Sequence, residues 1–238
     1  MKQIPLILAF LSTTLLCFGQ KEHLEYPKSA KINPADSLYF SKIKVYSDKF
    51  NALLYKGLLQ KPYAQYVCRP SFTASYAFSV EKIEGENYII SNKFSSSYME
   101  IVNYWKVDCY GRKDTVKVET HKIKIDNDLY LKIGELFELL AEQTKEKEQE
   151  RQFEVGADGE IYEILFARVD GTDYFFTTTD KNGEIKTGTT CSPHPSNKPM
   201  LCRLVKICDD LCSLEIEKSI FQTNILKELE SLINDLKI

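Results

Sequence analysis

This chain of 238 residues has seven cysteines and three histidines, and the side chains best suited to specific chemistry are among them. Cys191-Ser192-Pro193-His194 places a thiol and an imidazole in one short loop. A thiol becomes a nucleophile when a neighbouring base holds it as the thiolate. The spacing does not ensure contact across this proline-containing loop, so thiol chemistry is the less favoured hypothesis. Of the other histidines, His23 falls in an expected leader and His121 on the surface of an expected strand.

The same loop suggests a metal site as a second chemistry. Cys191, His194, Cys208 and Cys212 together could provide four zinc ligands. However, the spacing after His194 matches no finger or ribbon pattern. We therefore favour disulfides over zinc for these thiols.

Other stereotyped motifs are missing from the sequence. It contains no Gly-x-Ser-x-Gly elbow, no His-Glu-x-x-His helix, no glycine-rich phosphate loop and no dinucleotide fingerprint. The run from Asp180 to Glu184 lacks the alternating acidic ligands of a calcium loop, so we interpret it as a turn. We assign no catalytic, cofactor-binding or metal-ligating residue and expect no cofactor.

The amino-terminal 19 residues predict an export signal. Lys2 is followed by an uncharged run over residues 4–18 that is rich in Leu, Ile, Ala and Phe. The small residue Gly19 precedes the predicted cut before Gln20. A membrane span needs about 20 apolar residues, and this run is shorter. We therefore expect a secreted or periplasmic protein that begins near Gln20.

Six of the seven cysteines follow this signal, and an even number in an exported chain favours disulfides. The best single prediction joins Cys68 to Cys109, since each lies near the end of an expected strand. Cys208 and Cys212 are four apart on an expected helix, where a bridge between them has poor geometry. Cys191 is the better partner for one of them. The disulfide candidates are Cys68, Cys109, Cys191, Cys202, Cys208 and Cys212.

The charge pattern bears on the class of partner. The chain has 31 Lys and Arg against 34 Asp and Glu, and no basic run is longer than two residues. Such a sequence lacks the basic surface that binds phosphate backbones or anionic membranes. We expect no nucleic-acid partner and, after signal removal, no integral membrane segment.

Hydrophobic periodicity predicts a helix followed by strands in the first half of the chain. The polar residues 20–35 are expected to form an extended leader. From Asp36 to Leu58, apolar residues recur at steps of three and four, as on one face of a helix. Alternation then predicts four antiparallel strands, with a turn at Gly85, near residues 75–83, 87–95, 99–109 and 115–125.

The second half continues with a helix, further strands and two more helices. Asp126 or Asn127 can cap the first of these helices, and the charged tail 142–151 follows it. An internal boundary, if there is one, would lie near 142–152. Strands are expected at 161–169, 174–179 and 184–190, with a tight turn at Asn182-Gly183, and helices at 201–212 and 225–236. Residues 36–238 thus predict one α+β domain, with antiparallel sheet or sheets and helices packed on one side.

A resemblance supports the compartment and the fold. The residues on which the resemblance rests are turn and packing residues between 170 and 211: Asp170-Gly171-Thr172, Tyr174, Phe176, Gly188-Thr189, Ser192-Pro193, Leu204-Val205, Ile207 and Leu211. This stretch resembles the C-terminal part of exported proteins of Bacteroidota-type bacteria. The resemblance implies no particular activity, and cysteines 191, 202, 208 and 212 are not part of it.

The sequence therefore favours a non-enzymatic binding or structural module of the cell envelope, with an envelope protein or a glycan as candidate partner. The alternative is an extracytoplasmic hydrolase or thiol enzyme whose site is dispersed along the sequence.

Overall fold

The computed structural model describes residues 22–27, 48–97, 117–146, 152–155, 161–164, 171–214 and 219–237. At its centre lies a six-stranded sheet with the order β4-β3-β2-β1-β7-β8, in which neighbouring strands are antiparallel. These strands are β1 (Ala64–Pro70), β2 (Ala74–Ile83), β3 (Glu86–Ser97), β4 (Val118–Lys124), β7 (Thr172–Thr179) and β8 (Ile185–Cys191). A separate antiparallel pair consists of β5 (Gln152–Val155) and β6 (Ile161–Ile164).

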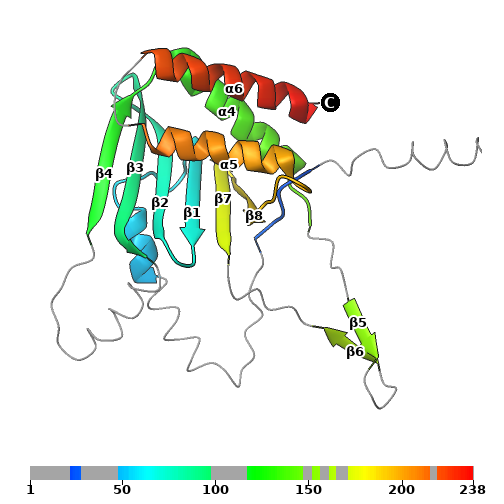
Figure 1. Cartoon of the computed structure of the whole chain (residues 1–238). Helices are drawn as coiled ribbons and strands as arrows, with labels where there is room; N and C mark the ends of the chain where they lie inside the picture. The colour runs from blue at the N-terminus through cyan, green and yellow to red at the C-terminus, as the bar shows by residue number, and fades with distance from the viewer. Residues whose placement is uncertain are drawn as a thin grey trace, which may run out of the picture.

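Three helices lie over one face of the six-stranded sheet, as Figure 1 shows. They are α4 (Asn127–Gln143), α5 (Pro199–Cys212) and α6 (Ser219–Lys237). α4 and α5 contact the strands, and α6 packs against both helices. None of the helices in the described ranges is long and apolar enough to cross a membrane.

The main core fills the space between these helices and the sheet. Because side chains alternate along a strand, Tyr66 of β1, Phe78 of β2 and Phe176 of β7 all face the helices. Val67 and Ala77 face the other way, where the helical segment 48–54 covers them. The expected α+β class, with antiparallel strands and helices packed on one side, is confirmed, and the segment 48–54 adds packing on the opposite face.

Most predicted strands and helices correspond to elements of the structure. The strands expected at 75–83 and 87–95 are β2 and β3, and those at 174–179 and 184–190 are β7 and β8. β4 lies within the range 115–125, and β6 begins the strand expected at 161–169. The helices expected from Asn127 and near 201–212 and 225–236 are α4, α5 and α6. The strand expected at 99–109 lies outside the described residues, as does most of the helix expected at 36–58.

The central strand β1 was not predicted. Its side chains are buried on both sides of the sheet, against the helices on one face and against segment 48–54 on the other. A strand covered on both faces loses the alternation of apolar and polar residues that identifies a half-exposed strand. The pattern therefore gave no signal where the sheet is most deeply buried.

Two hairpin turns show how the sequence controls chain reversal. Between β2 and β3, Glu84 and Gly85 both have positive φ, 53° and 87°, as a two-residue primed turn requires. Between β7 and β8 only Gly183 does, with φ 79°. The Asp180 amide donates to the Glu184 carbonyl over 2.9 Å, so this turn is longer than the expected tight Asn182-Gly183 turn.

The segment 22–27 is a structural part of the fold rather than only a leader. Leu24 is 1% exposed and belongs to the main core. Glu25 and Thr189 of β8 exchange two backbone hydrogen bonds, of 2.9 and 2.7 Å. The Glu22 carboxylate accepts bonds from the first amides of α5. The expected leader thus contributes one core side chain and one helix cap.

Candidate functional site

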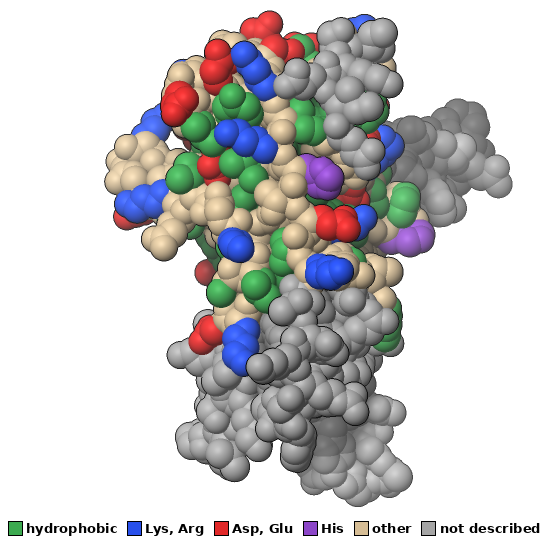
Figure 2. All heavy atoms as spheres, turned by 90° about the vertical axis from the view of Figure 1, so that its left-hand side faces the viewer, with side chains coloured by type: hydrophobic (Ala, Val, Ile, Leu, Met, Phe, Trp, Pro, Cys, Tyr) green, Lys and Arg blue, Asp and Glu red, His purple; other side chains and the backbone are tan. Residues whose placement is uncertain are grey.

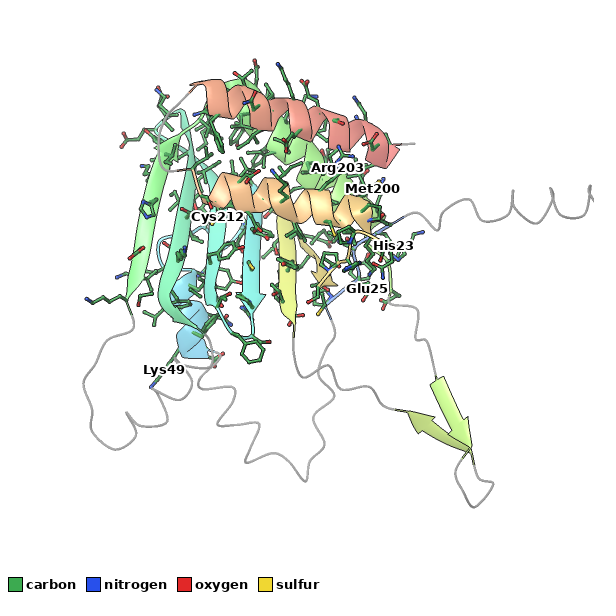
Figure 3. The ribbon with its side chains drawn as sticks, viewed as in Figure 1. His23, Glu25, Lys49, Met200, Arg203 and Cys212 are labelled. Atoms are coloured by element: carbon green, nitrogen blue, oxygen red, sulfur yellow. The ribbon has the colours of Figure 1, made fainter. Side chains whose placement is uncertain are left out.

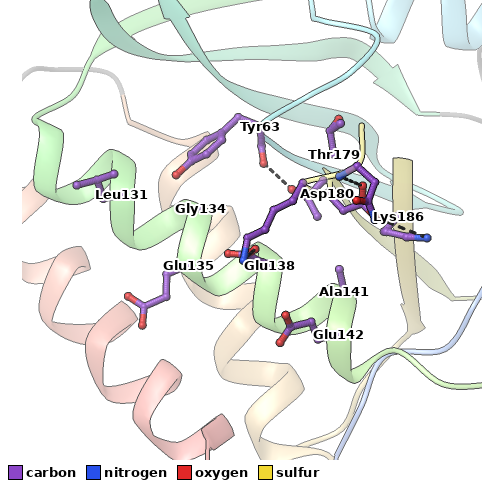
Figure 4. A pocket seen from close by; sticks show the side chains of 13 residues that line it. Tyr63, Leu131, Gly134, Glu135, Glu138, Ala141, Glu142, Thr179, Asp180 and Lys186 are labelled. Atoms are coloured by element: carbon purple, nitrogen blue, oxygen red, sulfur yellow. Dashed lines mark hydrogen bonds and ion pairs between the residues drawn. The ribbon is translucent and has the colours of Figure 1, made fainter. Parts of the chain in front are cut away.

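An open groove lies between α4 and the β7–β8 hairpin (Figure 4). It encloses about 600 Å³. One wall is a face of α4, and the other is the end of β7 with the turn that follows. Its lining residues are Tyr63, Leu131, Gly134, Glu135, Glu138, Ala141, Glu142, Thr178, Thr179, Asp180, Lys181, Asn182 and Lys186.

Tyr63 connects the two walls. Its ring stacks on Tyr130 of α4, with centroids 4.3 Å apart and planes 5° from parallel. On the other side, the Thr178 hydroxyl donates to the Tyr63 carbonyl over 2.7 Å. Gly134 makes the approach to α4 possible, because a Cβ there would collide with the Tyr63 phenol. The position of Tyr63 is therefore set by a glycine seventy-one residues later in the chain.

The α4 wall carries three carboxylates: Glu135, Glu138 and Glu142. The Glu135 carboxylate is 2.7 Å from Lys132 and 2.7 Å from Lys237. Hydrogen bonds from these two ammonium groups lower the pKa of Glu135 below its usual range. Glu135 is therefore an anion at neutral pH and a poor proton donor.

The hairpin wall presents Asp180, whose Oδ1 accepts bonds of 2.9 Å from the backbone amides of Asn182 and Glu184. These amide bonds, the one from Glu184 first, lower the pKa of Asp180, and the nearby Lys186 adds to the effect. This carboxylate is also held in its charged form. The groove can therefore bind polar or charged groups, while neither acid is tuned to donate a proton to a substrate.

A second polar cluster lies between α5 and the sheet, where Asp209 is half-buried. The Asp209 carboxylate accepts hydrogen bonds of 2.7 Å from both the Tyr66 and Tyr76 hydroxyls. Burial raises the pKa of Asp209, although the two tyrosine bonds oppose that shift. Burial also raises the pKa of Tyr174 to about 12. Tyr66, Tyr76 and Tyr174 are partly or fully buried side chains of the main core, and the hydroxyls of Tyr66 and Tyr76 share Asp209 as their acceptor, as expected for amphipathic rings on a sheet.

Three of the disulfide candidates surround this cluster. Burial raises the pKa of Cys68 and of Cys212 to about 12, and that of Cys208 well above its usual value. A thiol with such a pKa stays protonated at neutral pH and is a poor nucleophile. Cys212 contacts the Ala77 carbonyl at 3.8 Å, at the end of α5 that lies over β2 and β3 (Figure 3).

The remaining candidates lie elsewhere. Cys202 is on α5, where burial raises its pKa, and Cys109 lies outside the described residues. Cys191 ends β8 and pairs with Asp173, so strand alternation directs it to the face opposite α5. The structure therefore does not bring Cys191 to the helical cysteines, and no disulfide joins any two of the five cysteines in the described ranges. The expected pairing of Cys68 with Cys109 stays a prediction.

The loop after β8 does not join its thiol to its imidazole. Nδ1 of His194 lies 2.7 Å from the Ser196 hydroxyl, whereas the Cys191 thiol lies 4.0 Å from the Ser192 hydroxyl. Within the described part of the chain, no group of three or more His, Cys, Asp or Glu side chains is placed to hold a metal ion. Of the four residues considered for zinc, Cys191 ends β8, His194 lies in the loop that follows, and Cys208 and Cys212 lie on α5.

The outer face on the β4 side has a mixed surface. Figure 2 shows lysine and arginine interspersed there with aspartate and glutamate. His121 is exposed on β4, opposite Ser91 of β3, as expected for a surface residue.

Sequence reasoning missed the groove. Glu135, Glu138 and Glu142 follow one another at steps of three and four, which places them on one face of a helix, and this spacing was the available signal. Nothing in the sequence connected that face to Tyr63 or to the turn at Asp180, because these segments meet only after folding.

Comparisons of this chain with known proteins identify no family. The chain matches no protein-family model, and no curated protein or solved structure is significantly similar to it. The fold and the groove define an α+β protein with an open groove, lined by charged side chains, between a helix and a hairpin.

Proposed function

We propose that this chain is an exported, non-enzymatic binding module of the cell envelope, and that its ligand occupies the groove between α4 and the β7–β8 hairpin. The amino-terminal sequence supports export, since residues 1–19 have the composition and cleavage signature of a signal peptide. The resemblance over residues 170–211 to exported bacterial proteins supports the same compartment.

The main support for binding is that both walls of the groove are fixed in place and charged. Tyr63 is stacked on α4 and hydrogen-bonded to β7. Glu135 and Asp180, one on each wall, have lowered pKa values because cations and backbone amides stabilise their anions. A concave site with polar groups held in one charge state suits recognition.

The alternative, a thiol enzyme, is less well supported by the same geometry. Cys68, Cys208 and Cys212 lie in the core with raised pKa values. The buried thiols thus lack the electropositive, partly exposed surroundings of reactive cysteines.

The binding proposal is tested by filling the groove. In Ala141→Trp, a large ring enters the groove from the α4 wall, whereas Asn224→Trp adds the same ring to the exposed side of α6. We would titrate the isotope-labelled protein with envelope glycan oligomers and with short peptides, and record amide chemical shifts. The proposal predicts shifts at α4 and at residues 180–186 that Ala141→Trp abolishes and Asn224→Trp retains. If no probe moves these resonances, the groove is not a binding site.

The export proposal has its own test. Intact mass of the protein from the extracytoplasmic fraction should correspond to a chain beginning near Gln20. Recovery of the full-length chain from the cytosol would contradict it. A peptide map of the same protein, prepared without reductant, reports whether Cys68 and Cys109 are joined in a bridge.

A further inference from the structure

The charged side chains of the groove differ in how many oppositely charged partners they have. Glu135 and Lys186 already have partners within their own walls, Glu135 with two lysines of the helical layer and Lys186 with the acids of its own hairpin. Glu138 and Glu142 remain, one helical turn apart on α4. Across the groove from them, the hairpin supplies Lys181.

Lys181 bridges the two walls of the groove. Its Nζ lies 3.0 Å from Glu138 Oε1. Hydrogen bonding to Glu138 raises the pKa of Lys181, and the charge of Glu142 adds to the effect. No ion pair of Glu142 itself is found within the described ranges. One lysine thus serves two carboxylates, and a net negative charge is left at this end of the groove.

The ion pair between Lys181 and Glu138 is weak, so a ligand can displace Lys181 from it. The lysine side chain is 85% exposed, so water screens the ion pair and holding the long side chain in one place costs conformational entropy. Its position nevertheless shows that an ammonium group reaches Glu138 from the groove. A ligand ammonium could occupy the same place while Lys181 turns into solvent.

We propose that the groove takes an extended basic segment of an envelope protein, with one lysine or arginine side chain that replaces the Lys181 ammonium at Glu138 and also faces Glu142. This inference rests on the proposed binding function and names the chemistry of the partner. Charge complementarity favours a basic peptide over an uncharged glycan, because two carboxylates face one displaceable cation. Leu131, half-exposed in the lining, offers apolar contact for the stem of the bound side chain.

The test uses acetyl-Ala-Lys-Ala-amide as the probe, with norleucine or glutamate in place of its lysine as matched peptides. We would titrate each into the labelled mature chain at low ionic strength and follow amide shifts. The lysine peptide is expected to move resonances of α4 and of residues 180–186 at millimolar concentration, and added salt should weaken its binding. The norleucine and glutamate peptides should leave these resonances in place.

Three variants make the test specific to the Lys181 bridge. Lys181→Met keeps the aliphatic stem but removes the competing cation, so affinity for the lysine peptide should rise by about two- to fivefold. Glu138→Gln should lower that affinity by about fivefold or more. Asp210→Asn is the matched control, because its carboxylate lies on α5, outside the groove, and is paired with Lys206, so it should change affinity little.

The outcomes separate this inference from the proposed function. If N-acetylglucosamine oligomers move the groove resonances and the lysine peptide does not, the inference fails and the binding function stands. If neither probe moves them, both fail. Unchanged or weaker binding of the lysine peptide to Lys181→Met would overturn the displacement step.

Discussion

The open groove and the cluster around Asp209 combine the same kinds of residue, carboxylates beside tyrosines. The pKa values of their acids are nevertheless shifted in opposite directions. In the groove, the pKa values of Glu135 and Asp180 are lowered, because lysines and backbone amides stabilise these partly exposed anions. Between α5 and the sheet, the pKa of Asp209 is raised, because burial outweighs the two hydrogen bonds from Tyr66 and Tyr76. The direction of the pKa shift is therefore set by neighbouring donors in the groove and by burial at Asp209.

This difference separates a recognition site from a structural element. A solvated carboxylate can exchange its partner for a ligand at little cost. The half-buried Asp209 carboxylate accepts from one tyrosine of β1 and one of β2 and so ties two strands to α5, and it cannot exchange these partners without leaving their hydroxyls unpaired. We accordingly assign ligand binding to the groove and a structural role to Asp209.

The largest expected effect is the loss of Asp209. In Asp209→Ala, the hydroxyls of the buried Tyr66 and the partly buried Tyr76 lose their common acceptor, which should lower the free energy of unfolding by about 2–5 kcal/mol. Urea denaturation monitored by circular dichroism measures this change. Asp210→Ala is the control, since this neighbouring acid forms an ion pair with Lys206 on the surface, and it should change the free energy by about 0.5 kcal/mol or less. Equal effects from both substitutions would mean that the buried cluster has no special structural role.

Gly134→Ala should have an intermediate effect. The added methyl group meets the Tyr63 phenol, so the ring must move, and we expect a loss of about 1–3 kcal/mol in unfolding free energy. The change should also disturb the groove without touching the Asp209 cluster.

A double-mutant cycle with Tyr63→Ala isolates this contact. Once the phenol is gone, Gly134→Ala should cost much less than in the parent, because the two positions interact directly. Additive losses would show that Gly134 tolerates a side chain and that another cause lowers the stability.

The smallest expected effect, and the most direct comparison of the two regions, is the pH dependence of stability. The folded-state pKa of Asp209 lies above its unfolded value of about 3.9. Its favourable contribution is therefore fully present below that pH and is lost as pH rises through the folded pKa. For Glu135 the folded-state pKa lies below its unfolded value of about 4.3, so its contribution is present above that pH and is lost as pH falls through the folded pKa.

Unfolding free energies of the parent, Asp209→Asn and Glu135→Gln between pH 3 and 7 measure both contributions. The parent should lose stability relative to Asp209→Asn as pH rises, and lose stability relative to Glu135→Gln as pH falls. Slopes of the same sign in the two comparisons would mean that burial does not distinguish the two acids.

Local structure was largely predictable from the sequence. The stripes of α4, α5 and α6 and the alternation of β2, β3 and β7 depend on residues a few positions apart, and so do the turns at Gly85 and Gly183. Such signals act between chain neighbours, and short-range backbone and solvation preferences are enough to produce them. The α+β class follows from the order of these elements.

The interior and the sites were decided by tertiary structure. β1 carries no alternation because it is covered on both faces, and Leu24 lies in a mostly polar stretch yet packs in the core. On α5, Asp209 has the sequence context of a surface acid, and only the sheet beneath it supplies the tyrosines. Glu138 meets Lys181 from forty-three residues away. The sequence pattern around a residue reflects the conformational preferences of its own segment. The burial and the partners of that residue depend on which distant segments fold against it.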